Sequence, residues 1–314
     1  MANQQDISII IPVYNRAGLV TRALDSVVEQ TCPPKRVIVV DNNSSDNTFE
    51  VLCEYQKRTL PFELLVLQEM KPGAAAARNR GIAEIETSYA MFFDSDDTIP
   101  RDHVERTMKQ FAHPSQPDLV SWRGRYIAKN GNAITTLLPH GGDTMTSHLV
   151  HTCFSTSLMA MKTDLIRRAG GWDETLPVWD DYEWSTRLLL AAPVIESEDR
   201  IGGDFYMQEE SLTGTDFSSK AGKWELAIDA IERNISASSS PEKAKWMRWM
   251  IYRRVILCAL YARESGPALP SSRFPADRVR LLPPTHRAML RFIYEYTRRG
   301  GRGAYHFYRL VNGW

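Results

Sequence analysis

The sequence predicts an α/β fold with a Rossmann-like, doubly wound sheet flanked by helices and followed by a C-terminal helical subdomain. In the first hundred residues, four apolar runs alternate with segments of helical length. These runs are apolar throughout, as expected for strands of a parallel sheet that helices cover on both faces. After about residue 222 no strand-like run remains, and the chain is predicted to be helical to its end.

The first half of the fold is predicted as repeated β-α-β units. The expected strands are 7–13, 35–41, 62–68 and 88–93. The expected helices between them are 17–31, 46–58 and 73–84. Ser44 or Ser45 is placed to cap the second of these helices, because a serine hydroxyl can accept from the free N–H groups of a first helical turn.

The second half changes character after residue 115, with shorter strand-like runs separated by turn signals such as Asn130-Gly131. These runs, at 118–128, 133–138 and 155–161, predict a mixed or antiparallel extension of the sheet. Helices are expected at 163–169, 180–191, 222–236, 241–263 and 285–299. We therefore predict a catalytic domain over residues 1–225 and a basic helical subdomain over residues 226–314.

Composition limits the class of protein. A hydrophobic fraction of 43% and a charged fraction of 24% are typical of a globular chain. No run of about 18 apolar residues and no basic leader is present, so the sequence predicts a cytoplasmic location. The formal net charge of zero hides an asymmetry, because residues 226–314 hold sixteen Lys or Arg against six Asp or Glu. A basic tail of this kind suits an anionic lipid or a phosphorylated acceptor.

Three aspartates, Asp94, Asp96 and Asp97, follow the fourth predicted strand. Carboxylates this close repel one another unless a cation or a proton offsets their charge. Residues two apart project to the same side of an extended chain, so Asp94 and Asp96 are predicted to share a Mg²⁺ or Mn²⁺ ion, which prefers oxygen ligands. An isolated cluster of this type is more often a solvated turn, but ligands of α/β sheets bind at the carboxyl ends of strands. The role of Asp97 stays open.

Five segments resemble, in the expected order, family 2 glycosyltransferases of the GT-A fold. The segments are ISIIIPVYNR, VVDNNSSDNT, GAAAARNRG, FFDSDD and GGWDETLPVWDDYEW, which together span roughly residues 7–190. Five motifs in order are far more specific than any one of them. The resemblance implies a mixed sheet of the GT-A type, a nucleotide-sugar donor and transfer with inversion.

The resemblance also implies which residues bind the donor. They are Pro12, Tyr14, Asn15, Asp41, Arg78, Asp94 and Asp96. Asp41 would contact the nucleoside base or ribose. Arg78 would pair with a phosphate or with Asp94, while an ordinary salt bridge within its helix is an equal alternative from the residues alone.

The downstream acidic segment is implied to act on the acceptor. By resemblance Asp181 is the general base that takes the proton from the acceptor hydroxyl as it attacks the anomeric carbon. Asp180 stands where the family usually has a glutamate, and Trp179 is a candidate platform for an acceptor sugar, although such a tryptophan more often packs in a core. Many relatives carry an arginine and a histidine in a loop over the donor, and residues 206–213 contain neither.

The sequence therefore predicts an enzyme that moves a sugar from a nucleoside diphosphate sugar, with UDP favoured, to a glycan or lipid-linked acceptor in cell-surface polysaccharide synthesis. One alternative is a sugar-nucleotide binding or scaffold protein with a decayed site, against which the retained carboxylates argue. Another is a sugar-nucleotide pyrophosphorylase, which needs a glycine-rich basic loop that IPVYNRAGLV lacks. No nucleic-acid partner is expected. The basic segment 242–263 predicts either a membrane-surface helix or a core helix with a solvated basic face.

Overall fold

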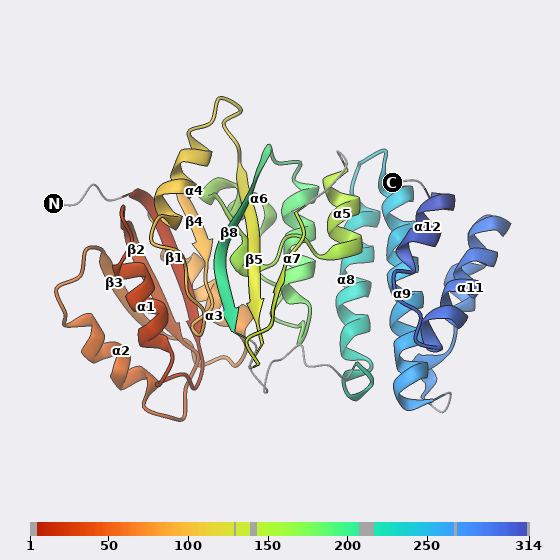
Figure 1. Cartoon of the computed structure of the whole chain (residues 1–314), viewed down its shortest axis with the longest axis horizontal. Helices are drawn as coiled ribbons and strands as arrows, with labels where there is room; N and C mark the ends of the chain where they lie inside the picture. The colour runs from red at the N-terminus through yellow and green to blue at the C-terminus, as the bar shows by residue number, and fades with distance from the viewer. Residues whose placement is uncertain (1–4, 129, 139–142, 207–216, 267–268, 313–314) are drawn as a thin grey trace. The chain divides into compact units, whose positions relative to one another are not determined.

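The computed structural model describes residues 5–128, 130–138, 143–206, 217–266 and 269–312 (Figure 1). The chain divides into two compact units. The first comprises Met1–Leu138, Cys153–Thr175 and Arg187–Gln208, and the second comprises Pro139–Thr152, Leu176–Thr186 and Glu209–Trp314. Segments that precede residue 225 thus belong to the second unit, and the ranges 1–225 and 226–314 stay a prediction as separately folding domains.

The first unit contains one mixed sheet, in which the described residues form eight strands in the order β3-β2-β1-β4-β7-β5-β6, with β8 paired to β5. The strands are β1 (Gln5–Val13), β2 (Pro34–Asp41), β3 (Glu63–Gln68), β4 (Tyr89–Phe92), β5 (Leu119–Ile127), β6 (Ala133–Thr135), β7 (Met159–Lys162) and β8 (Ile195–Tyr206). Strands β1 to β4 are parallel to one another, whereas β7 is antiparallel to both β4 and β5. The predicted mixed sheet flanked by helices is confirmed.

Helices connect and cover these strands because each has one apolar stripe. The helices of this unit are α1 (Val20–Val28), α2 (Thr48–Gln56), α3 (Ala74–Ile82), α4 (His103–Phe111) and α6 (Thr163–Ala169). In α1 the buried residues recur every three or four positions, as an amphipathic helix requires. Helix α3 lies very close to β1, since a Cβ atom on Gly81 would meet Ile10 Cγ2 at 2.5 Å. The helix that precedes the aspartate cluster is therefore fixed against the central strand.

Three elements of this unit differ from the sequence prediction. Helix α4 and strand β8 had no predicted counterpart. The predicted strand 155–161 is a short 3₁₀ turn, Thr156–Leu158, followed by β7. Within the turn, the carbonyl of Ser157 accepts a hydrogen bond from the indole of the buried Trp122 at 3.1 Å.

The second unit is helical. Its helices are α5 (Thr144–His151), α8 (Lys223–Ala237), α9 (Lys243–Ser265), α10 (Ala276–Val279), α11 (Pro284–Arg298) and α12 (Tyr305–Asn312), and α7 (Asp180–Leu190) begins in it. Helix α9 lies between α8 and the pair formed by α11 and α12 (Figure 1). Among the described residues, no helix is long and apolar enough to cross a membrane.

Helix α9 coincides with the segment that was a candidate membrane-surface helix. Ten of its residues are buried, among them Trp249, Tyr252 and Tyr261. Its arginines bond within the unit, for example Arg254 with Asp229 at 2.6 Å. The helix is therefore the core-facing alternative of the two that the sequence allowed.

Candidate functional site

The predicted donor-binding residues gather at one edge of the sheet. Strands β1, β2 and β4 are parallel, so their carboxyl ends lie at the same edge, and Val13 of β1 pairs with Asp41 of β2. Asp94 and Asp96 follow the end of β4, which pairs with β1 at Ile10 and Phe92. The fold thus brings Asp41 and the aspartate cluster to the edge where α/β sheets bind ligands.

Within the cluster, burial alternates along the chain. Asp94 and Asp96 are partly exposed, whereas Ser95 and Asp97 are buried. The backbone N–H of Asp97 donates to the carbonyl of Asp94 at 3.3 Å, so the cluster forms a turn and not an extended segment. The shared side of Asp94 and Asp96 stays a prediction. Asp97 Oδ1 accepts a hydrogen bond from the backbone N–H of Tyr206 at 3.1 Å.

The charge of the cluster is only partly offset. Arg78 Nη2 lies 3.4 Å from Asp94 Oδ1, and Arg16 Nε lies 3.5 Å from Asp96 Oδ2. Burial and the charge of Asp94 nevertheless raise the pKa of Asp96. Burial, with the charges of Asp94 and Asp96, raises the pKa of Asp97 to about 9. The carboxylates of the site therefore disfavour one another's charge, which a bound cation would offset.

Arg78 is buried to 7% exposure on α3. Its guanidinium carbon lies 4.5 Å from the ring centre of Trp172, and the group pairs with Asp94. The structure thus favours pairing with the aspartate cluster over an ordinary helix salt bridge. Trp172, itself buried, packs edge-on against Phe92 at 5.6 Å and is a core residue.

The residues predicted for the nucleotide side have different environments. Asp41 is fully buried, and its Oδ1 has no hydrogen-bond partner in the described part of the chain. Asn15 adopts a φ of 50° and its Oδ1 accepts from Ser45 N–H at 2.8 Å, so this side chain orders the loop after β2. Pro12 is buried inside β1, and Tyr14 is 56% exposed. An unpartnered buried carboxylate oxygen is costly, which makes Asp41 a candidate acceptor for a ligand N–H or O–H.

Sequence reasoning missed two basic residues and a serine beside the cluster. Arg16 pairs with Asp96, and Ser157 Oγ lies 3.4 Å from Asp94 Oδ2. Arg22, on α1, donates to the carbonyl of Asp96, and its guanidinium carbon lies 4.2 Å from the ring centre of Tyr206. Arg16 lies inside the motif ISIIIPVYNR and could have been noticed, whereas Arg22 and Ser157 belong to no motif. Residues 207–213, which lack the family's arginine and histidine, lie outside the described residues.

The predicted acceptor-side residues lie in the second unit, at the start of α7. Asp180, Asp181 and Glu183 occupy its first turn, where the helix dipole favours negative charge. Asp181 Oδ1 accepts from the N–H of Tyr182 at 2.8 Å. Trp179, with a φ of 55°, is half-buried and packs against Trp224 with ring centres 4.7 Å apart. Its role as an acceptor platform and that of Asp181 as base stay predictions.

The aspartate cluster fits a hard divalent cation. Its donors are carboxylate oxygens, which suit Mg²⁺ or Mn²⁺ and not the softer metals that thiolates select. Among the described residues, no group of three or more His, Cys, Asp and Glu side chains is arranged as a complete metal site. Asp94 and Asp96 would therefore supply only part of a coordination shell, which leaves positions for a ligand's own oxygens.

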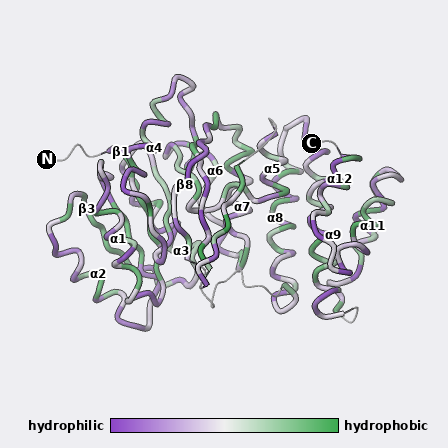
Figure 2. Tube along the Cα trace, viewed as in Figure 1, coloured by the Kyte–Doolittle hydropathy of each residue, from purple (hydrophilic) through white to green (hydrophobic). Residues whose placement is uncertain are grey.

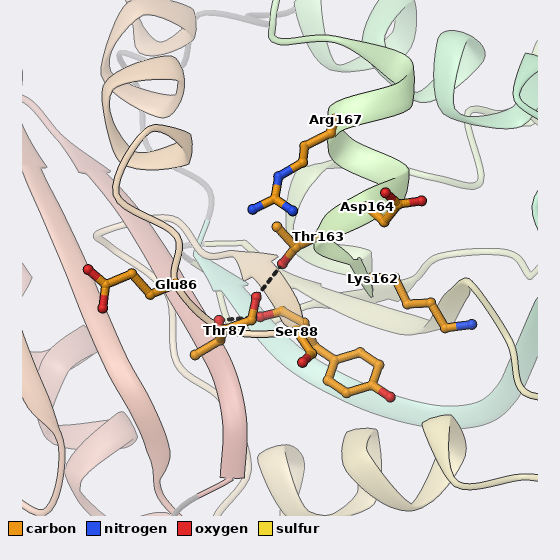
Figure 3. A pocket seen from close by; sticks show the side chains of 8 residues that line it. Glu86, Thr87, Ser88, Lys162, Thr163, Asp164 and Arg167 are labelled. Atoms are coloured by element: carbon orange, nitrogen blue, oxygen red, sulfur yellow. Dashed lines mark hydrogen bonds between the residues drawn. The ribbon is translucent and has the colours of Figure 1, made fainter.

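A surface hollow of about 460 Å³ lies at the opposite end of β4 (Figure 3). Its lining includes Thr87 and Ser88, just before β4, and Lys162 and Thr163, where β7 meets α6. In Figure 3 a dashed line joins Thr163 to Thr87, whose carbonyl accepts from the Thr163 hydroxyl at 2.7 Å. Because β4 separates this hollow from the aspartates, it is not the predicted donor site.

Comparison with known proteins gives relatives of one kind. A poly(ribitol-phosphate) beta-glucosyltransferase of Bacillus spizizenii is 35% identical over 133 residues, which cover 41% of this chain and 20% of that protein. The chain spans about a fifth of the length of several curated relatives that it matches.

Two solved structures are similar in fold. S. aureus TarS 1–349 in complex with UDP-GlcNAc aligns with a TM-score of 0.69 and 18% identity, over 98% of this chain and 90% of TarS 1–349. The mannosyltransferase PcManGT of Pyrobaculum calidifontis, in complex with GDP-Man and Mn²⁺, aligns with a TM-score of 0.54 and 18% identity, over 99% of this chain and 88% of that one.

The structural likeness shows that the fold is GT-A, as the resemblance implied. The family model described as glycosyl transferase family 2 matches residues 8–167, slightly more than half of the chain. That range includes both strand ends that carry Asp41 and the aspartate cluster. The chain belongs to glycosyl transferase family 2.

Proposed function

We propose that the chain is an inverting glycosyltransferase that transfers a sugar from a UDP-sugar to a hydroxyl of a glycan or lipid-linked acceptor. The observation that carries the proposal is the aspartate cluster at the carboxyl end of β4. Asp94 and Asp96 are partly exposed there, Arg78 and Arg16 contact them, and burial with the charge of Asp94 raises the pKa of Asp96. A diphosphate with its divalent cation has the charges that this arrangement needs.

In this proposal the first unit holds the donor. Asp41 accepts from the nucleoside through its unpartnered Oδ1, with Pro12, Tyr14 and Asn15 along the same edge. Asp94 and Asp96 hold Mg²⁺ or Mn²⁺, which when bound neutralises the charge that develops on the leaving diphosphate. Arg78, already against Asp94, orients that carboxylate.

Asp181 serves as the general base in the same proposal. Its carboxylate takes the proton of the acceptor hydroxyl as oxygen attacks the anomeric carbon and the bond to the nucleoside diphosphate breaks. Attack opposite the leaving group inverts the configuration at that carbon. Asp180 and Trp179 position the acceptor beside it.

The finer assignments have separate support. UDP is chosen because TarS, which shares the fold, binds UDP-GlcNAc. An acceptor of the cell-surface polysaccharide class is chosen because a relative is named a poly(ribitol-phosphate) beta-glucosyltransferase. The cytoplasm is proposed as the compartment because all four cysteines are free thiols, which persist in a reducing environment.

The base assignment is tested with Asp181→Asn and the matched neighbour Asp180→Asn. Loss of a general base typically costs about 10²- to 10⁴-fold in turnover, so Asp181→Asn is expected to lose transfer while its donor Kd changes by less than about twofold. Asp180→Asn, which alters acceptor positioning alone, is expected to raise the KM for the acceptor and to keep most of kcat. Equal turnover of wild type and Asp181→Asn would refute the assignment.

The donor is tested by thermal shift with UDP-, GDP- and dTDP-sugars, each with and without Mn²⁺. A donor that binds only the folded chain raises Tm in proportion to its saturation, and we expect the largest rise for a UDP-sugar with Mn²⁺. A flat response across the panel would contradict a nucleotide-sugar enzyme. Donor binding without transfer or hydrolysis would instead support the decayed binding protein.

A further inference from the structure

The outer face of helices α11 and α12 is unusual in carrying both exposed apolar residues and unpaired arginines. In α11 the buried residues His286, Leu290, Ile293 and Thr297 recur with helical spacing and face α9. The opposite stripe is open to solvent, and hydrophilic and hydrophobic residues alternate along both helices (Figure 2). We call the exposed residues of 280–310 on these helices and their flanks the arginine–aromatic face.

The apolar part of this face is continuous from one helix to the other. Phe292 of α11 is 50% exposed, and its ring centre lies 5.4 Å from that of Phe307 on α12. Tyr296 completes the cluster at 5.3 Å from Phe307. Leu310, two residues from the buried Tyr308 and so on the other side of α12, is 75% exposed. Leu281, just before α11, is 78% exposed.

The charged part is strongly basic. Residues 270–312 contain nine arginines, no lysine and two acidic residues, Asp277 and Glu295. Arg298 and Arg299 pair with Glu295, and Arg278 lies near Glu232. In the part of the chain that the structure describes, the other six arginines have no carboxylate within ion-pair distance and are all exposed. They are Arg273, Arg280, Arg287, Arg291, Arg302 and Arg309.

We propose that the arginine–aromatic face docks on a membrane surface rich in anionic phospholipid. Guanidinium groups bind phosphate in a bidentate manner, and exposed aromatic and aliphatic side chains between them can enter the headgroup region. Leu281 and Leu310 favour lipid over nucleic acid, because an aliphatic side chain offers no ring on which a base stacks.

The proposal stands independently of the sugar-transfer reaction, and it narrows the sequence expectation of peripheral membrane contact through the basic C-terminal helices. The membrane-surface candidate was the segment 242–263, which is the buried helix α9. The structure assigns that contact instead to α11 and α12, which the charge pattern alone did not distinguish from the rest of the tail.

Vesicle flotation of the full chain tests the proposal. Vesicles of phosphatidylcholine with about 30% phosphatidylglycerol are compared with pure phosphatidylcholine at low salt and at about 0.5 M salt, where the Debye length falls to a few ångströms. Wild type is expected to float with the anionic vesicles only, and salt is expected to release it. Absence of binding to anionic vesicles at low salt would overturn the proposal.

The charge is tested with Arg287→Gln, Arg291→Gln and Arg309→Gln together. Each arginine near an anionic surface is expected to strengthen binding about fivefold, so the triple variant should bind about 100-fold more weakly. The matched control removes three exposed basic charges elsewhere, with Lys35→Gln, Arg167→Gln and Lys223→Gln. An equal loss in the control would show general charge attraction and would refute a specific face.

The apolar part is tested with Phe292→Ser and Leu310→Ser, and Leu226→Ser, 48% exposed on α8, is the control. The two face variants are expected to weaken vesicle binding at least tenfold each, and the control should bind as wild type does. Circular dichroism and transfer to a soluble acceptor check that each variant is folded. Competition of vesicle binding by duplex DNA at equal phosphate, or a dimer that the face variants dissociate, would assign the face to those partners and overturn the proposal.

Discussion

Two acidic clusters in this chain are similar in sequence but differ in how the fold treats the charge of their carboxylates. Asp94, Asp96 and Asp97 end a strand, where burial and mutual repulsion raise the pKa values of Asp96 and Asp97. Asp181 and Glu183, in contrast, begin α7, where the free N–H groups of a first helical turn stabilise negative charge.

The hydrogen-bond and ion-pair partners of the two clusters also differ. Glu183 is 2% exposed, and its Oε1 accepts from Asn234 Nδ2 at 2.7 Å. In the aspartate cluster, burial and the neighbouring carboxylate of Asp94 still raise the pKa of Asp96 although Arg16 pairs with it. A cluster whose charged form is disfavoured in the folded chain is a stronger sign of a ligand site than a cluster whose carboxylates are hydrogen-bonded within the fold. The role of Asp181 therefore rests on resemblance more than on local chemistry.

The largest expected effect is on the turnover of a variant in the aspartate cluster at Asp94, Asp96 and Asp97. Asp96→Asn is expected to lower turnover more than about 100-fold, since loss of a metal ligand should cost more than the 10- to 100-fold typical of groups that only support ligands. The same change should raise the Tm of the ligand-free chain, because it removes a charge that burial and Asp94 disfavour.

Turnover and a ligand-free melting curve measure the two effects together. Asp164→Asn, at an exposed site paired with Arg168, serves as the control and should change neither quantity much. A lower Tm for Asp96→Asn would mean that the cluster is stabilising, and the contrast between the two clusters would fail.

The second expected effect is on the unfolding free energy when the hydrogen bond to Glu183 in α7 is removed. Asn234→Ala removes the donor to Glu183 and leaves a buried carboxylate short of a partner, which is expected to cost about 1 to 3 kcal/mol of unfolding free energy. Urea unfolding measures the change, and Asn234→Asp, which places a carboxylate beside Glu183, should cost more. An unchanged stability of Asn234→Ala would show that Glu183 has no need of this bond.

The sequence predicted the part of the site that depends on local rules. Strands β1 to β4 each contain an apolar run, and their carboxyl ends follow from the β-α-β order. The period of two in an extended chain predicted that Asp94 and Asp96 share a side, whereas the cluster forms a turn.

What the sequence did not predict depends on contacts far apart in the chain. Asp97 binds the N–H of Tyr206 across 109 positions, and no local pattern signals such a pair. Strand β8 begins IESEDRIGG, which has no apolar run, and its order comes from pairing with β5. The arginine–aromatic face of α11 and α12 was likewise not predicted, because the net charge of a segment does not show which of its helices is buried.

The smallest effect is a dependence on pH with opposite signs in the two regions. Behind α7, the ring of His148 is fully buried with its Nε2 3.4 Å from the carbonyl of Tyr182. Burial, with the nearby charge of Arg253, lowers the pKa of His148 to about 3. The unfolded chain takes up a proton at this histidine as the pH falls through about 6.5, while the folded chain does not, so acid costs stability from pH 6.5 down to about 3.

Acid acts the other way on the aspartate cluster, where the raised pKa of Asp96 means that a proton relieves repulsion in the folded chain. His148→Gln keeps an N–H at the position of Nε2 and removes the titration. Between pH 7 and pH 6 this variant should lose roughly half to one kcal/mol less unfolding free energy than wild type. Melting curves across this range measure the slope, and the exposed His113→Gln should leave it unchanged. If the unfolding free energy of wild type and of His148→Gln falls with the same slope as the pH is lowered, then the buried His148 is not the source of the acid sensitivity. The opposite pH responses expected for the two regions would then be refuted.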